Sequence, residues 1–374
     1  MLGAGASKIF GLKTLQDLTS DLVEKMTDLG YEKTISDIVQ AIKHYGLNPD
    51  FENIYTTLEG LATAKEGIRR NGGLTTYIAY KTNYIAQQAP AIIDQYKKTL
   101  SDLRELIYRE CSIPKGVIER KGKIFDRLFG TIGANYQLGD HRFLTEQRSV
   151  LSVTGQAHNE TVGVGAVVVT TNYDMAIELY HRSRDLKIVD GFKRTENDCY
   201  KELDFNEFGR TPNSRWLLKL HGSIWQFVKS DGQIIQTINA LENLALEVSV
   251  RERMMIYPVG EKPILQYPYF PFYSMFRAQL WNVLIAIGHS FRDDPINVAI
   301  LERLKNSGAK LIVINPEAET VVQNIGPLTE DIKQRIIRIS QPFEDKNALF
   351  DKLGIALQCG NMTEFRRKAR SLSR

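Results

Sequence analysis

The sequence predicts an α/β fold in which a mostly parallel sheet is combined with a large helical insertion. Two observations lead to this prediction. Across residues 163–320, short apolar runs rich in β-branched residues alternate with polar and helical stretches. Runs that are apolar at nearly every position are typical of strands buried on both faces, as in a parallel sheet. The expected strands cover residues 166–170, 216–220, 283–287 and 311–314.

Residues 17–159 are expected to form the helical insertion. Leu18, Leu22 and Met26 follow one another at four-residue spacing, and apolar residues recur in the same way between Ile93 and Ile107. Such spacing places apolar side chains on one face of a helix. Residues 321–374 are also predicted to be mainly helical, and they end in a basic segment. That segment is either a solvated helix face or a docking surface for a partner or a nucleic acid.

The composition is that of an ordinary globular protein. Of the 374 residues, 43% are hydrophobic and 25% are charged, and the net charge of +4 is too small to indicate a dedicated nucleic-acid binder. The cysteines Cys111, Cys199 and Cys359 are widely separated, which excludes a disulfide framework and a cysteine-type zinc site and favours a reducing cytoplasm. No run reaches the ~18 apolar residues of a membrane span, and the first residues lack a secretory signal. We therefore expect a cytoplasmic protein without membrane contact.

Small or polar residues follow each predicted strand. Residues 171–174 follow the first strand, 221–223 the second, 288–294 the third and Asn315 the fourth. A glycine-rich turn at residues 3–7 precedes a helical stretch. Because open parallel sheets bind ligands outside the carboxyl ends of their strands, we expect these segments to face one crevice.

Each segment has a chemical and a structural interpretation. The turn at 3–7 could bring backbone N–H groups to a pyrophosphate, or it could be a simple glycine turn. Asn172 could position a ribose hydroxyl or a water, and Asp174 could accept a hydrogen bond from an amide. Alternatively, these two residues form an Asx turn that begins the next helix. Asp293 and Asp294 could hold Mg²⁺ in a nuclease, or they could cap the helix that Pro295 begins.

His221 is the candidate general base, because histidine is the side chain that titrates near neutral pH without perturbation. The glycine that follows it, Gly222, allows close approach of a ligand. The alternative is a structural histidine at a strand end. His289 suits a backbone contact with phosphate better than catalysis. The other histidines are interpreted as surface or structural residues: His44, His141, His158 and His181.

Taken in order, these segments resemble the sirtuin-like superfamily, and most closely its prokaryotic branch of NAD-degrading antiphage effectors. The resemblance rests on GAGAS at 3–7 with GLKT at 11–14, TTNYD at 170–174, KLHGS at 219–223, IGHSFRDD at 287–294 and IN at 314–315. It implies a Rossmann-like NAD-binding domain built from residues 1–16 and 160–320.

The resemblance also implies a role for each matched residue. Asn172 would orient the nicotinamide ribose or the attacking water, Asp174 would contact the nicotinamide amide, and His221 would be the base. The remaining contacts to NAD would come from Gly3, Ala4, Gly5 and Ser7 at the pyrophosphate, from Gly288, His289 and Ser290 on the phosphate and adenosine-ribose side, from Asn315 at the adenosine ribose, and from Thr14 and Thr171.

The sequence departs from the family in two places. Deacylating sirtuins carry a four-cysteine zinc module after the His-Gly motif, whereas this chain has no cysteine between positions 199 and 359. We therefore expect no zinc and no deacylase groove. The family also has a strand before the glycine turn, and only Met1 and Leu2 precede it here. Either the recorded start lies downstream of the true one, or the first strand is missing.

The expected activity is hydrolysis of NAD⁺, as a substrate, to nicotinamide and ADP-ribose, with depletion of NAD⁺ as an antiphage defence. The resemblance implies a homo-oligomer that works with a partner ATPase or an Argonaute-type sensor protein. Three alternatives stay open: ADP-ribosyl transfer, deacylation, and a sensor that binds NAD or ADP-ribose without turnover.

Overall fold

The computed structural model describes residues 1–44, 46–62, 90–114, 116–136, 145–151, 157–163, 167–195, 200–210, 215–237, 250–256, 267–279 and 281–373. The chain divides into two compact units. The first unit comprises Met1–Gly11, Ile113–Met254 and Tyr267–Arg374, and the second comprises Leu12–Ser112 and Met255–Gln266.

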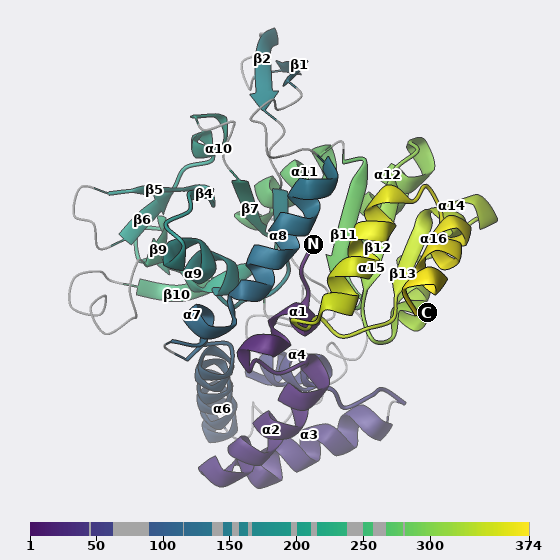
Figure 1. Cartoon of the computed structure of the whole chain (residues 1–374). Coiled ribbons are helices and arrows are strands. Elements are labelled where there is room, and N and C mark those ends of the chain that lie inside the picture. Colours follow the sequence, from purple (N-terminus) through teal and green to yellow (C-terminus); the bar gives the residue numbers. More distant parts are fainter. Residues whose placement is uncertain are drawn as a thin grey trace. The chain divides into compact units, whose positions relative to one another are not determined.

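A parallel sheet forms the centre of the first unit (Figure 1). One half has the order β3-β7-β4, with β3 at Val167–Thr170, β7 at Arg215–Lys219 and β4 at Ile188–Val189. The other half has the order β11-β12-β13, with β11 at Val283–Ile287, β12 at Lys310–Ile314 and β13 at Ile336–Ile339. Every pairing within these halves is parallel, which confirms the predicted mostly parallel sheet.

Leu2 joins the two halves of the sheet. It forms parallel bridges to Thr170 of β3 and to Ile287 of β11. The amide of Leu2 donates a hydrogen bond to Val169 O at 2.8 Å, and the amide of Gly3 donates one to Ile287 O at 2.9 Å. The first three residues therefore make the pairings of a central strand, and the sheet runs β4-β7-β3-Leu2-β11-β12-β13.

The four predicted strands are present at nearly the predicted positions. β11 has the predicted bounds, and β12 begins one residue before the predicted start. β7 is shifted by one residue toward the N-terminus. β3 begins at Val167, and residue 166 lies outside the described residues.

Other strands were not predicted. β13 lies in the stretch that was expected to be mainly helical. Its sequence is not a continuous apolar run, because Arg338 interrupts it. β1 (Thr145–Leu151) and β2 (Ala157–Gly163) form an antiparallel pair within the expected helical insertion and at its edge. A five-stranded sheet in the order β10-β8-β9-β6-β5 accompanies the parallel one, and the pairs β8·β9, β6·β9 and β5·β6 are antiparallel. Its strands are β5 (Phe192–Arg194), β6 (Tyr200–Leu203), β8 (Gly222–Lys229), β9 (Ile234–Thr237) and β10 (Val250–Met255).

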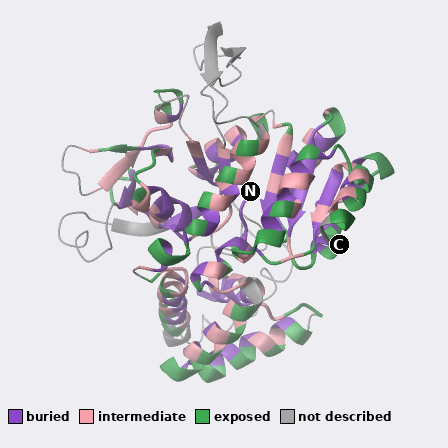
Figure 2. Cartoon of the chain, in the orientation of Figure 1, coloured by how far each residue is buried: buried purple, intermediate pink, exposed green. Residues whose placement is uncertain are grey.

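Helices pack around the parallel sheet (Figure 1). They are α1 (Ala4–Ser7), α7 (Val117–Lys121), α8 (Lys123–Tyr136), α9 (Ala176–Ser183), α10 (Asn206–Arg210), α11 (Tyr269–Ala278), α12 (Asp294–Asn306), α13 (Ala318–Val321), α14 (Glu330–Arg335), α15 (Asn347–Gln358) and α16 (Met362–Ala369). The strands are largely buried (Figure 2), and their side chains meet Phe125 of α8 and Leu353 of α15 in one hydrophobic core. α7 and α8 therefore belong to the sheet unit, although the expected insertion reached residue 159.

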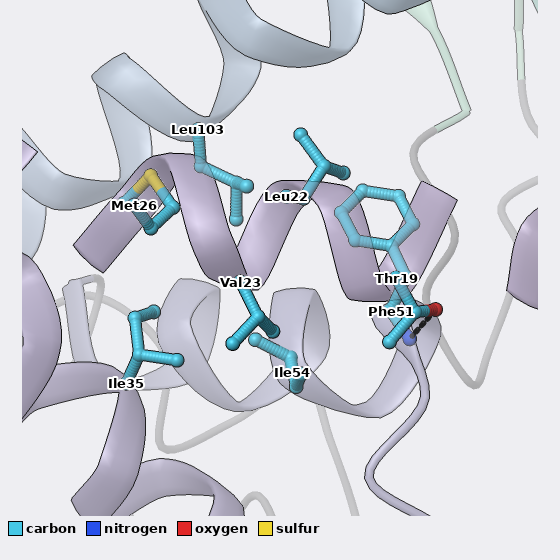
Figure 3. Close-up of a pocket in the computed structure, with 8 residues that line it drawn as sticks. All are labelled: Thr19, Leu22, Val23, Met26, Ile35, Phe51, Ile54 and Leu103. Atoms are coloured by element: carbon cyan, nitrogen blue, oxygen red, sulfur yellow. Dashed lines mark hydrogen bonds between the residues drawn. The ribbon is translucent and has the colours of Figure 1, made fainter. Parts of the chain in front are cut away.

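The second unit is helical. It contains α2 (Leu15–Met26), α3 (Glu32–His44), α4 (Phe51–Ala62) and α6 (Pro90–Glu110), and a short π-helical stretch at Thr27–Tyr31 links α2 to α3. A cavity of about 10 Å³ lies among these helices and is lined mostly by apolar side chains, including Leu22, Ile35 and Leu103 (Figure 3). A cavity of this size has room for about one water molecule and cannot hold a nucleotide. None of the described helices is long and apolar enough to cross a membrane.

Glycines allow α1 to approach the end of β11 in the first unit. The backbone of Gly288 has a φ of 60°, and a Cβ atom placed there would lie 2.3 Å from the amide nitrogen of Ala6. A Cβ atom on Gly3 would lie 2.6 Å from the carbonyl oxygen of Gly288. Because the atoms that would clash belong to the backbone, a rotamer change cannot relieve the overlap.

We predict that Gly288→Ala destabilises the protein by about 3 kcal/mol or more, because α1 must move away from β11. Urea denaturation of the purified protein measures the loss. Gly308→Ala is the matched control, since a Cβ atom at Gly308 meets nothing within 4 Å. Similar unfolding midpoints for the two variants would contradict the close approach described here.

Candidate functional site

The segments that follow the strands meet at the carboxyl edge of the parallel sheet. Asn172, just after β3, donates through Nδ2 to the carbonyl oxygen of Gly3 at 3.0 Å. The amide of Gly5 donates to the carbonyl oxygen of Gly288, just after β11, at 3.1 Å. The glycine turn therefore lies between the ends of β3 and β11.

A chain of hydrogen bonds links Asn172, Ser7 and Asp174. Nδ2 of Asn172 also donates to Ser7 Oγ at 2.9 Å, and Ser7 Oγ donates to Asp174 Oδ2 at 2.7 Å. Because the Gly3 carbonyl can only accept, these contacts fix which end of the Asn172 amide is the nitrogen. Oδ1 of Asn172 has no hydrogen-bond partner among the described residues, so it is available to accept one from a ligand.

Asp174 has a structural contact as well as its bond to Ser7. Its Oδ1 accepts a hydrogen bond from the amide of Ala176 at 2.9 Å, at the start of α9. The Asx-turn interpretation thus holds for this residue. Asp174 is buried, and each carboxylate oxygen can accept a further hydrogen bond. The turn therefore does not exclude a contact with an amide N–H of a ligand.

The glycine turn uses most of its own backbone donors. The amides of Gly3, Gly5 and Ala6 donate to carbonyl oxygens of the chain, and the hydroxyl of Ser7 is held between Asn172 and Asp174. Ala4, in contrast, is exposed at the first position of α1. If this turn meets a pyrophosphate, the approach is over Ala4 and not through the Ser7 hydroxyl.

His221 is buried at the end of β7, with 4% of its surface exposed. Its Nε2 lies 3.6 Å from Asp293 Oδ1, and its ring centroid lies 6.4 Å from that of Tyr173. Tyr173 is held by its carbonyl oxygen, which accepts from the amide of Ile224 at 3.0 Å and from Ser223 Oγ at 3.1 Å. These contacts bring His221 beside the loop that carries Asn172.

The remaining histidines are structural or exposed where the structure describes them. His181 is buried and contacts Ile177 O and Arg215, each at 2.8 Å, and burial lowers its pKa to about 4. Nδ1 of His289 accepts a hydrogen bond from the amide of Phe291 at 3.0 Å, so this ring shapes its own loop. His44 is exposed. Position 141 and the side chain at position 158 lie outside the described residues.

The residues expected on the adenosine side lie at the ends of β11 and β12. Asn315 Nδ2 donates to His289 O at 3.2 Å, and Asn315 Oδ1 accepts from the amide of Glu317 at 2.9 Å. Ser290 is exposed. The two side-chain contacts of Asn315 join the two strand ends and fix the amide orientation.

The two expected threonine contacts have different surroundings. The amide of Thr171 donates to Leu2 O at 3.3 Å, at the edge of the sheet that carries Asn172. Thr14 belongs to the second unit, where its hydroxyl accepts from the amide of Asp17 and caps α2.

Among the residues that the structure describes, the acidic and thiol groups form no metal centre. Asp293 is buried whereas Asp294 is exposed in the first turn of α12, so the two carboxylates have different environments. Within the described ranges, no group of three or more His, Cys, Asp or Glu side chains is arranged to hold a metal ion. Cys111 and Cys359 are free thiols, and position 199 lies outside the described residues.

A buried ion pair supports the loop that carries Asn172 and was not predicted. Lys219 donates to Glu178 Oε1 of α9 at 3.0 Å and to the backbone carbonyl of Asp174. Only 2% of the Lys219 side chain and 7% of that of Glu178 are exposed. Burial raises the pKa of Glu178. The KLHGS motif contains Lys219, but its partner lies 41 residues away, and no local spacing connects the two.

We predict that Lys219→Met destabilises the fold by about 3–5 kcal/mol, because it leaves the Glu178 charge buried and unpaired. A carboxyl pKa that is higher in the folded state than in the unfolded state favours folding at low pH. The loss should therefore be smaller at about pH 5 than at about pH 8 in urea denaturation.

Two further variants control this prediction. Adding Glu178→Gln should recover part of the lost stability, and Lys193→Met, at an exposed strand position, should have little effect. A Lys219→Met loss that is the same at both pH values would contradict the role of the buried charge.

Part of the chain that carries this site matches a known protein family. No curated protein matches the chain. Residues 166–337 match the family model described as SIR2-like domain. This range includes β3, β7, β11, β12 and the loops that follow them, while the glycine turn precedes it. The match supports a sirtuin-like family that binds NAD, in agreement with the resemblance found in the sequence.

Proposed function

We propose that the site hydrolyses NAD⁺ to nicotinamide and ADP-ribose. The observation that carries the proposal is the hydrogen-bonded chain from Gly3 through Asn172 and Ser7 to Asp174. These bonds hold the Asn172 carboxamide at the carboxyl edge of the parallel sheet. Residues 166–337, which include β3, β7, β11 and β12, match a SIR2-like domain. His221, a group suited to accept a proton at neutral pH, ends the neighbouring strand.

In this proposal the dinucleotide lies across the edge between β3 and β11. The pyrophosphate contacts the glycine turn at Ala4. Gly3 and Gly5 flank Ala4 and have no side chain, so the backbone of the turn can approach the ligand closely. The adenosine ribose lies toward Gly288, His289, Ser290 and Asn315. The nicotinamide ribose lies at Asn172, whose Oδ1 accepts from a ribose hydroxyl or from the attacking water. Asp174 accepts from the nicotinamide amide.

The reaction breaks the bond between the nicotinamide nitrogen and ribose C1′. The cationic nicotinamide nitrogen takes the bonding electron pair and leaves as a neutral molecule, so no acid is needed. The transition state has oxocarbenium character, as in other glycoside cleavages. Water forms the new C1′–O bond, and His221 accepts the proton that the water loses. One water is consumed for each NAD⁺.

The biological role follows from the resemblance of the motifs and is part of the proposal. An enzyme that degrades NAD⁺ without control would harm its own cell. We therefore propose an antiphage effector whose basal activity is low until a trigger raises it, that forms a homo-oligomer, and that works with a partner ATPase or an Argonaute-type sensor. A monomer that is fully active without any partner would contradict this part.

We predict that purified protein incubated with NAD⁺ releases nicotinamide and ADP-ribose in equal amounts, as measured by liquid chromatography. His221→Ala and Asn172→Ala should each lower the rate of NAD⁺ hydrolysis about 100-fold or more. The first variant loses the general base, and the second loses the side chain that positions the attacking water. Circular dichroism checks that both variants stay folded, since Asn172 also bonds to Gly3 and Ser7.

His44→Ala is the matched control, because this histidine is exposed in the helical unit, and it should keep the wild-type rate. Wild-type rates in both site variants would overturn the assignment. Other products separate the alternatives: cyclic ADP-ribose indicates a cyclase, labelled protein indicates transfer, and calorimetric binding without nicotinamide release indicates a sensor.

A further inference from the structure

Asp293 lies at the N-terminus of α12 but is not used there as a helix cap. It occupies the N-cap position, and its side chain makes no capping hydrogen bond. Its carboxylate instead lies 3.6 Å from Nε2 of His221. Both residues are buried, with 8% of Asp293 and 4% of His221 exposed. A buried carboxylate is stabilised by an ionisable group close to it.

We propose that Asp293 is the positioning residue for His221, an inference that rests on the function proposed above. The carboxylate holds the imidazole ring in place and stabilises its protonated form. Because the carboxylate faces Nε2, it favours the tautomer with the proton on that nitrogen.

The separation of 3.6 Å is longer than a hydrogen bond and corresponds to a close charge contact. At such a distance a carboxylate favours the charged form of a neighbouring group, and burial strengthens the effect because water screens it less. Catalytic contacts often shorten only when substrate is bound. We therefore expect the 3.6 Å contact between the two side chains to become shorter when NAD⁺ binds.

The loop before α12 is built to direct Asp293 inward. Phe291 is a buried residue with a φ of 53°, a backbone conformation that residues other than glycine rarely adopt. Asn297 fixes this loop, because its Nδ2 donates to Phe291 O at 2.8 Å and to Asn324 O at 3.0 Å. The amide of Asn297 also donates to Asp293 O at 2.9 Å. The backbone on both sides of Asp293 is thus held by buried contacts.

Several elements bring titratable groups toward His221. Asp293 approaches from the start of α12, and Tyr173 approaches from the loop after β3. On its own strand, Lys219 lies two residues earlier, and its ammonium is bound by Glu178 of α9 and by the Asp174 carbonyl. Asp293 is therefore the carboxylate whose removal changes the charge beside the ring while leaving the Lys219 pair intact.

We predict that Asp293→Asn lowers kcat/KM for NAD⁺ hydrolysis at about pH 8 by about tenfold or more. The acidic limb of the pH profile should move to lower pH by about one unit or more, because loss of the carboxylate makes His221 a weaker base. Asparagine has nearly the same size and shape as aspartate, so the substitution removes the charge with little change in packing.

Asp294→Asn is the matched control, since it removes the same charge from the exposed neighbouring residue. It should keep the wild-type pH profile. Asp293→Glu should restore part of the activity and the acidic limb. The proposal is overturned if the profile of Asp293→Asn coincides with that of the wild type, or if Asp294→Asn moves it equally.

Nuclear magnetic resonance of protein labelled on its six histidines tests the pair without any catalytic turnover. In the wild type, the ring nitrogen shifts of neutral His221 should report the proton on Nε2. The titration midpoint of His221 should fall by about one pH unit or more in Asp293→Asn and stay unchanged in Asp294→Asn. If no NAD⁺ hydrolysis is found and the midpoint still falls, the proposed function fails and the pairing stands. An unchanged midpoint overturns the pairing itself.

Discussion

Everything at this site depends on the parallel pairing of Leu2 between β3 and β11. Without the hydrogen bonds from Leu2 to Val169 and from Gly3 to Ile287, the two halves of the parallel sheet would not be joined through this segment. The pairing is parallel on both sides, so the residues that follow all of these strands point to one edge. The glycine turn at residues 3–7 begins directly after Leu2. Its backbone lies close to Gly288, just after β11. A short stretch of backbone thus decides where every candidate functional residue lies.

Buried polar contacts then give the edge its rigidity. Asn172, Ser7 and Asp174 bond to one another, and Lys219 connects Asp174 to Glu178 beneath them. Buried polar groups are costly when they lose a partner, so such a network strongly favours one arrangement. Its geometry uses the Asn172 nitrogen within the protein, and among the described residues the Asn172 oxygen has no hydrogen-bond partner. In the proposed function, the residues that stabilise the loop also contact NAD⁺.

The sequence predicted four of the parallel strands because each is a continuous apolar run, and it suggested the candidate site from the polar residues that follow those runs. It did not predict β13, whose apolar run is interrupted by Arg338, nor the antiparallel sheet, whose strands β5 and β6 are short and only partly buried. The pairs Lys219–Glu178 and His221–Asp293 were also missed. Their partners lie 41 and 72 residues apart in sequence, and only the folded chain brings them together.

In the proposed function, one edge of the sheet holds the whole dinucleotide, with Asn172 at the nicotinamide ribose. A crystal structure of the protein with ADP-ribose bound tests this most directly. We expect the pyrophosphate beside Ala4 and Gly288, and Asn172 Oδ1 within hydrogen-bond distance of the terminal ribose. ADP-ribose bound at that edge in the reverse direction, or bound to a different part of the chain, would contradict it.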